Sequence, residues 1–198
     1  MTPSTKTMSR IKPVIFIFLL LPSLIWLYQF FAGSLGVNPI DQLIDKSGEF
    51  ALRLLVLTLL LSSLAQLKYM RSLQMIRGMV GLFVFYYLVL HLMTYVILDH
   101  YFNWKFILKD AIKRPFITLG FTSFFLLVPL ALTSTNIMVK KLTYKVWKNI
   151  HELIYVAAPL AALHFYLLTK ADKIEPMIYL LIIFILFTWR IFTRVFKH

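Results

Sequence analysis

The chain has 198 residues, of which 60% are hydrophobic and 15% charged, and its mean hydropathy is +0.80. This composition excludes an ordinary soluble domain, where about half of the residues are apolar and about a quarter charged, and it excludes intrinsic disorder. Lys and Arg number 21 against 8 Asp and Glu, a net charge of +13 that suits nucleic acid or an anionic membrane surface. The chain has no cysteine, which excludes disulfides and thiolate-bound zinc or iron–sulfur centres.

Six apolar segments follow one another along the chain. A helix that crosses a bilayer needs about 20 mostly apolar residues, and the segments that meet this requirement cover about residues 14–31, 50–67, 79–98, 116–132, 150–169 and 177–192. No interval between them is long enough to fold separately. The sequence therefore predicts an all-α membrane protein, with residues 1–198 forming a single transmembrane domain of six bundled helices.

The first segment follows basic residues, as a signal peptide does, but it is longer than the usual apolar region of about 7–15 residues. We expect it to remain as the first membrane helix. Pro22, Pro129 and Pro159 lie inside three of the segments. Membrane helices tolerate internal prolines, so we expect kinks there rather than helix ends.

The distribution of charge between the loops predicts the orientation. Thirteen basic residues, with no acid among them, lie at the two termini and in the second and fourth loops: Lys6, Arg10, Lys12, Lys68, Arg71, Arg77, Lys140, Lys141, Lys145, Lys148, Arg190, Arg194 and Lys197. The other side carries seven basic and seven acidic residues. Because short cytoplasmic loops are enriched in Lys and Arg, both termini are predicted to be cytoplasmic. The charge then indicates contact with membrane lipids and not with nucleic acid.

Two histidines lie within predicted helices at similar depth. His91 lies seven residues before Leu98 and His164 five before Thr169, which are the outer ends of the third and fifth segments. At 1.5 Å per residue they lie roughly 10 and 8 Å below the same membrane face. Two imidazoles at one depth on different helices suit the two axial ligands of a heme iron. The alternative is that each packs as a hydrogen-bonded core histidine.

The other histidines have weaker patterns. His151 opens the fifth segment, about 19.5 Å from His164 along a helix, near the cytoplasmic side. It is either a ligand of a second heme or an interfacial residue on a solvated face. The second heme would be partnered by a Met, a Tyr or the terminal His198, or would be five-coordinate. His100 is expected to be a solvated loop residue. Glu49 and Arg53, four residues apart, are expected to form an ion pair at the start of the second helix.

Several stretches resemble the MsrQ (YedZ) family of heme-binding membrane subunits of the periplasmic protein-methionine-sulfoxide reductase system. The resemblance runs in order from about Leu35 to Phe192. Its motifs are Leu35-Gly36-Val37-Asn38-Pro39, Gly81-Leu82 with His91-Leu92 and Tyr95, residues 113–120 (KRPFITLG) and 129–134 (PLALTS), Trp147 with Ile150-His151-Glu152-Leu153, and Leu163-His164-Phe165-Tyr166.

The resemblance implies a ferric-reductase-like transmembrane domain in the bacterial inner membrane. It implies one or two b-type hemes with axial iron ligands at His91, His164 and His151, and it implies FMN. Such proteins pass electrons from the quinone pool or a cytosolic flavin reductase to a periplasmic molybdopterin-containing subunit, which reduces methionine sulfoxide in oxidised proteins. The chain is then an electron-transfer subunit rather than the catalytic one. The alternatives are a transmembrane ferric reductase that acts directly on metal chelates, and a solute or proton transporter with histidine relays.

Overall fold

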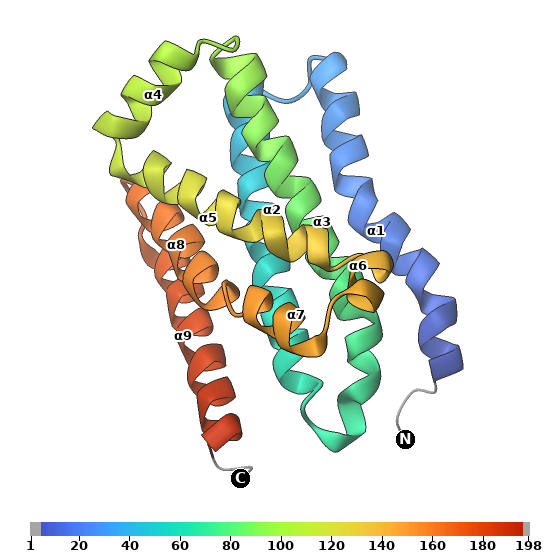
Figure 1. Ribbon diagram of the computed structural model, residues 1–198. Helices are drawn as coiled ribbons and strands as arrows, with labels where there is room; N and C mark the ends of the chain where they lie inside the picture. The colour runs from blue at the N-terminus through green and yellow to red at the C-terminus, as the bar shows by residue number, and fades with distance from the viewer. Residues whose placement is uncertain (1–4, 196–198) are drawn as a thin grey trace. The chain divides into compact units, whose positions relative to one another are not determined.

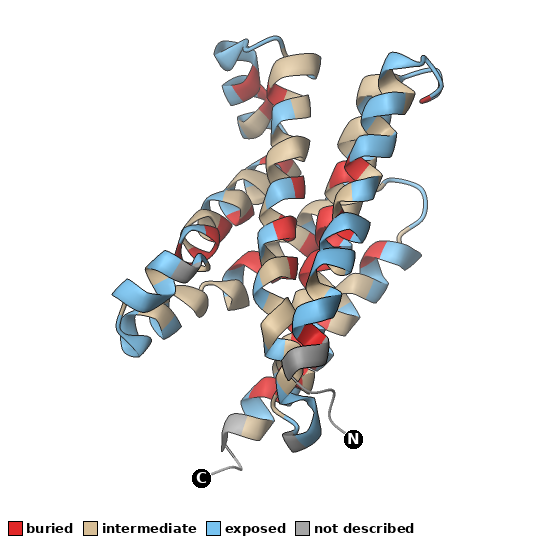
Figure 2. Ribbon diagram, turned by 90° about the vertical axis from the view of Figure 1, so that its right-hand side faces the viewer, coloured by how far each residue is buried: buried red, intermediate tan, exposed pale blue. Residues whose placement is uncertain are grey.

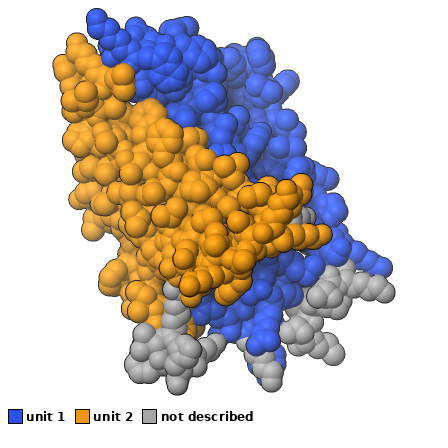
Figure 3. Space-filling view, in the orientation of Figure 1, with its two compact units in different colours: residues 1–107 blue, residues 108–198 orange. Residues whose placement is uncertain are grey.

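The computed structural model describes residues 5–195, and the side chains of residues 8–67, 69–135 and 137–193. The described chain is all-α (Figure 1). It forms two compact units, residues 1–107 and 108–198, which Figure 3 shows in separate colours. Each unit is described by itself below.

Six helical stretches in the described residues are long and apolar enough to cross a membrane, as the hydropathy pattern predicts. They are Met8–Phe31, Pro39–Leu64, Tyr69–Asp99, Pro115–Thr133, Tyr144–Leu168 and Ile174–Thr193. Many large apolar side chains on them are exposed, which suits contact with lipid. Figure 2 shows these exposed positions interspersed with the buried ones.

The first unit is built on the packing of α2 (Pro39–Leu64) against α3 (Gln74–Met93). α1 (Thr5–Phe31) lies beside both helices and is joined to α2 through a turn in which Gly33 and Gly36 have positive φ angles of 65° and 108°. The Tyr87 side chain of α3 is fully buried and donates its hydroxyl hydrogen to the Leu19 carbonyl of α1, at 2.6 Å.

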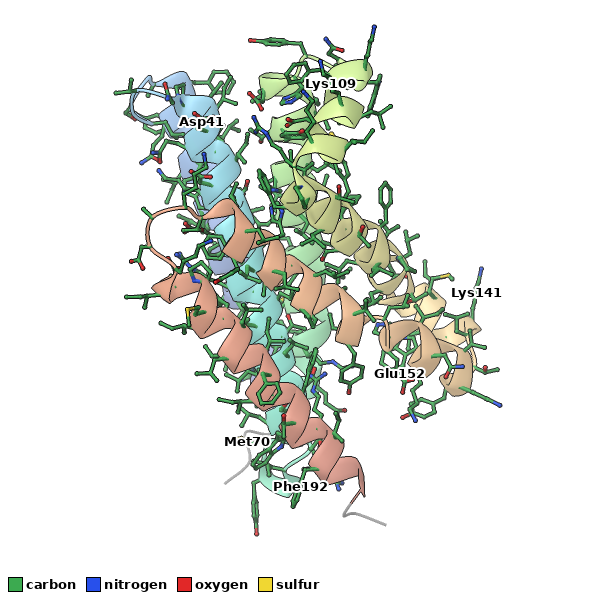
Figure 4. All side chains as sticks on the ribbon, turned by 90° about the vertical axis from the view of Figure 1, so that its left-hand side faces the viewer. Asp41, Met70, Lys109, Lys141, Glu152 and Phe192 are labelled. Atoms are coloured by element: carbon green, nitrogen blue, oxygen red, sulfur yellow. The ribbon has the colours of Figure 1, made fainter. Side chains whose placement is uncertain are left out.

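Short irregular helices flank α3 at both ends. The 3-10 helix η1 (Lys68–Leu73) precedes it, and the π-helix η2 (Thr94–Asp99) follows it without a break. Figure 4 labels Asp41, near the start of α2, and Met70, in η1 at the other end of that helix. α4 (Trp104–Lys113) begins after η2 and crosses the boundary between the units.

The second unit pairs α5 (Pro115–Thr133) with α8 (Ile154–Leu168), and α9 (Ile174–Val195) packs along α8. Two short helices connect α5 to α8: α6 (Asn136–Lys141) and α7 (Tyr144–His151). Threonine caps both of them. The Thr135 side chain accepts from the Met138 N–H and the Thr143 side chain from the Val146 N–H.

The structure confirms the predicted positions of three prolines and corrects one predicted helix. Pro22, Pro129 and Pro159 all lie inside helices, as predicted. The segment predicted as one helix over residues 150–169 instead contains a turn after His151, which separates α7 from α8. Figure 4 labels Glu152 at this turn.

Candidate functional site

His91 lies on α3 and is anchored to the backbone of α2. Its Nδ1 atom lies 2.9 Å from the Ile44 carbonyl oxygen. A carbonyl can only accept, so Nδ1 carries the hydrogen and a neutral ring has its lone pair on Nε2. The ring lies against Gly48: a Cβ atom at that position would come 2.9 Å from Nδ1 and 3.0 Å from Cε1 of the imidazole.

His164 on α8 has the same arrangement in the second unit. Its Nδ1 atom lies 2.6 Å from the Phe116 carbonyl oxygen of α5, which assigns the hydrogen to Nδ1 and the lone pair of the neutral ring to Nε2. The ring lies against Gly120, where a Cβ atom would come 2.9 Å from Nδ1 and 3.0 Å from Cε1. Phe116 also contributes its ring, 6.1 Å from the imidazole between centroids.

The two arrangements share one pattern, which we call the histidine–glycine contact: Ile44, Gly48 and His91 in the first unit and Phe116, Gly120 and His164 in the second. In both, the glycine lies four residues after the accepting carbonyl. In an α-helix the N–H of that glycine donates to the same carbonyl. The accepting residue and the histidine are 47 residues apart in one unit and 48 in the other.

Neither Gly48 nor Gly120 was predicted from the sequence to contact a histidine. A signal was present for Gly120, which lies inside the predicted membrane helix 116–132, but not for Gly48, which lies just before the predicted helix 50–67. Their separations from His91 and His164 are also nearly equal, at 43 and 44 residues. Neither observation identifies a contact before the helices are paired in space.

His151 has different surroundings. Its Nδ1 atom lies 3.0 Å from the Trp147 carbonyl oxygen of its own helix, and its Nε2 atom lies 3.3 Å from the Ser134 hydroxyl at the end of α5. The imidazole stacks on the Trp147 ring with 3.9 Å between centroids. The predicted role as a ligand of a second heme stays a prediction. The proposed partner His198 lies outside the described residues.

His100 is not the solvated loop residue that the sequence suggested. Its side chain is only 9% exposed, and its Nδ1 atom lies 2.8 Å from Asp99 Oδ2. The ring packs between Tyr95 and Phe106, at centroid distances of 4.3 and 5.2 Å. The chain turns directly after it, with positive φ at Tyr101 and Phe102.

The predicted ion pair between Glu49 and Arg53 is present, with 2.9 Å between Glu49 Oε2 and an Arg53 guanidinium nitrogen. It lies in the middle of α2 rather than at the start of a helix, because α2 begins at Pro39. The charged residues between Pro39 and Phe50 lower the hydropathy of the first part of α2, so hydropathy alone places the start of this helix too late.

The available histidines suit a metal whose remaining ligands come from a cofactor. Among the described side chains, no three His, Asp or Glu residues gather into a metal site. A heme needs only one or two axial ligands from protein, and a neutral imidazole held through Nδ1 is oriented to bind iron through Nε2. His91 and His164 therefore have the chemistry of axial heme ligands.

Comparison with known proteins gives a consistent result. The model of the ferric reductase like transmembrane component matches residues 47–162. The protein-methionine-sulfoxide reductase heme-binding subunit MsrQ of Caulobacter vibrioides is 46% identical over 85% of this chain and 80% of its own length. The MsrQ subunits of Herminiimonas arsenicoxydans and Azospira oryzae are 41% and 39% identical over 96% and 98% of this chain, and over 88% and 83% of their own lengths.

The matches to the MsrQ subunits cover most of the chain. The match to the family model includes His91 and His151 and ends shortly before His164. They agree with the six membrane-spanning helices and with the resemblance noted in the sequence. The chain therefore belongs to the family of MsrQ heme-binding subunits of protein-methionine-sulfoxide reductase, built on a ferric-reductase-like transmembrane domain.

Proposed function

We propose that this chain carries electrons across the bacterial inner membrane to a periplasmic protein-methionine-sulfoxide reductase, using heme b with His91 and His164 as the axial ligands of its iron. The observation that carries the proposal is the shared histidine–glycine contact. Two imidazoles on different membrane helices have the same hydrogen-bonded tautomer. Membership of the MsrQ family supports heme as the group that they bind.

The protein's own contribution is to hold the ligands and exclude water. When bound, heme supplies a centre that takes up and releases one electron at a time. The carbonyls of Ile44 and Phe116 orient the two rings, and the apolar helices surround them with few polar groups. His151 is proposed as a ligand of a second heme. The chain then binds two hemes if His151 is a ligand and one heme if it is not.

Direction and partners follow from the charge pattern and the family. With thirteen basic residues on the cytoplasmic side, His91 and His164 lie toward the periplasmic face. The donor is the quinone pool or a cytosolic flavin reductase, and the acceptor is a molybdopterin-containing subunit. Reduction of methionine sulfoxide to methionine and water consumes two electrons and two protons, so each turnover needs two one-electron transfers. FMN is not named by the relatives quoted above, and the proposal does not include it.

The experiment is a heme titration of purified wild type, His91→Ala and His164→Ala. We expect a low-spin b-type spectrum in the wild type and its loss in both variants, because each variant removes one axial ligand. A His100→Ala variant is the matched control and keeps the spectrum. If both single variants retain wild-type heme absorbance, the ligand assignment is wrong.

A second candidate function is direct reduction of metal chelates, which the ferric reductase family match favours. The two functions differ in their need for the periplasmic reductase subunit. Membranes that contain this chain but lack that subunit should not oxidise a reduced quinol or flavin donor when offered ferric chelate. Persistent ferric reduction in those membranes would favour the second function.

A further inference from the structure

We propose that Gly48 and Gly120 are positioning residues for the ligands of the heme: each leaves the space in which an imidazole reaches the backbone of the neighbouring helix. This inference rests on the proposed function, because it concerns how His91 and His164 are oriented. The glycines themselves bind nothing.

The close approach is specific to these two positions. A Cβ atom at Gly48 or Gly120 would come 2.9 Å from an imidazole nitrogen, and real Cβ atoms essentially never make a contact under 3.0 Å. The neighbour is a ring that is tied to a carbonyl and packed between helices, so it cannot swing aside as a flexible side chain does. A methyl group would therefore displace the ring from its carbonyl.

Other helical glycines in the same chain lack this contact. A Cβ atom at Gly81 would meet a Thr58 methyl carbon at an ordinary 3.7 Å, and a Cβ atom at Gly78 would meet nothing within 4 Å. Both lie in α3, on the same helix as His91. Alanine is a better helix former than glycine, so alanine at these two positions should be accepted without loss.

The recurrence in both units supports a ligand-orienting role over simple packing. Each unit repeats the same three parts: a carbonyl, a glycine four residues later, and a histidine that donates to the carbonyl from the partner helix. The parts lie on α2 and α3 in one unit and on α5 and α8 in the other. What the two contacts have in common is the orientation of an imidazole, while the surrounding side chains differ.

The test compares heme affinity in Gly48→Ala and Gly120→Ala with that in Gly78→Ala and Gly81→Ala. Loss of an outer partner of a metal ligand costs about 10- to 100-fold in metal affinity. We expect losses of that size in the first two variants, with a changed low-spin electron paramagnetic resonance signal, and wild-type behaviour in the two controls. Wild-type affinity and signal in Gly48→Ala and Gly120→Ala would overturn the inference.

A second pair of variants covers the case in which the added methyl group prevents folding. Gly48→Ala/His91→Ala and Gly120→Ala/His164→Ala remove the ring that the methyl group would meet. We expect each double variant to reach the membrane and resist unfolding as well as its single histidine variant does. If a double variant fails where the single histidine variant folds, the methyl group meets something other than the imidazole, and the inference is wrong.

The outcomes separate this inference from the proposed function. Loss of heme in the histidine variants together with full affinity in the glycine variants would leave the ligand assignment standing and remove the role of the glycines. Retention of heme in the histidine variants would overturn the ligand assignment and the glycine inference with it.

Discussion

The histidines of this chain differ most in the group that each Nδ1 atom faces. His91 and His164 donate to carbonyls of a neighbouring helix, whereas His151 lies against a carbonyl of its own helix and stacks on Trp147. Sequence position could single out all three as candidates, because histidine within or at the edge of a membrane helix is rare. It also set His151 apart by its depth in the membrane. It could not show which carbonyl each ring faces, because the acceptor of a histidine hydrogen bond depends on how the helices pair.

The first prediction concerns His151. We expect His151→Ala to lower the heme content by no more than about half, because any heme held by His91 and His164 keeps both axial ligands. The pyridine-hemochrome assay on purified protein measures the heme content, with His164→Ala as the comparison. Complete loss of heme in His151→Ala would show that the two sites do not bind heme independently.

At the scale of helices, hydropathy predicts the membrane-crossing segments and misses what connects them. α6 and α7 are short, and neither is an apolar run. Thr135 and Thr143 cap them, and residues 144–151 lie in a helix that hydropathy alone begins at residue 150. The turn after His151 has no glycine or proline to mark it.

α8, which packs against α5, buries several small residues, a feature that hydropathy does not record. Ala157, Ala158 and Ala162 are fully buried on α8, and small side chains let membrane helices approach closely. The Ser123 hydroxyl of α5 donates to the Ala157 carbonyl of α8 at 2.9 Å, in a buried position.

We predict that Ser123→Ala destabilises this pair by about 0.6 kcal/mol and at most about 1.7 kcal/mol, the range measured for hydrogen bonds between membrane helices. Unfolding in detergent micelles with increasing denaturant measures the change. The matched control is Ser62→Ala, because the Ser62 hydroxyl donates to the Thr58 carbonyl of its own helix. Equal stability of the two variants would contradict an interhelical role for Ser123.

At the scale of the whole molecule, the excess of basic residues makes a prediction about sidedness. Thirteen Lys and Arg residues at the termini and in two loops predict that both termini are cytoplasmic. If the six candidate spans among the described residues all cross the membrane, the number of crossings is even and the two termini lie on the same side, in agreement with this prediction.

Reporter fusions test the orientation. Green fluorescent protein fused after His198 should fluoresce, because it folds in the cytoplasm, and alkaline phosphatase fused at Asp172, between α8 and α9, should be active in the periplasm. The opposite pattern at both positions would reverse the orientation and the direction of electron flow.

The recurrence of the histidine–glycine contact could not be recognised from the sequence alone, although the separations between glycine and histidine are nearly equal. Each contact consists of a backbone carbonyl, a glycine and a histidine. Every residue has a carbonyl, so the sequence does not show which one accepts the hydrogen bond. The structure reveals the recurrence because it shows which backbone carbonyl accepts the hydrogen bond in each contact. Each contact can be recognised only when the packing of its two helices is known.

The hydrogen bonds at His91 and His164 have an electrochemical consequence. A ring that donates from Nδ1 becomes more basic at Nε2, and a more basic ligand favours the more highly charged state of a metal. If each ring ligates a heme iron, as in the proposed function, each would lower the reduction potential of the iron that it binds. Under the proposed function, the electron donor would then have to be a strong reductant, and transfer to the acceptor would be favoured.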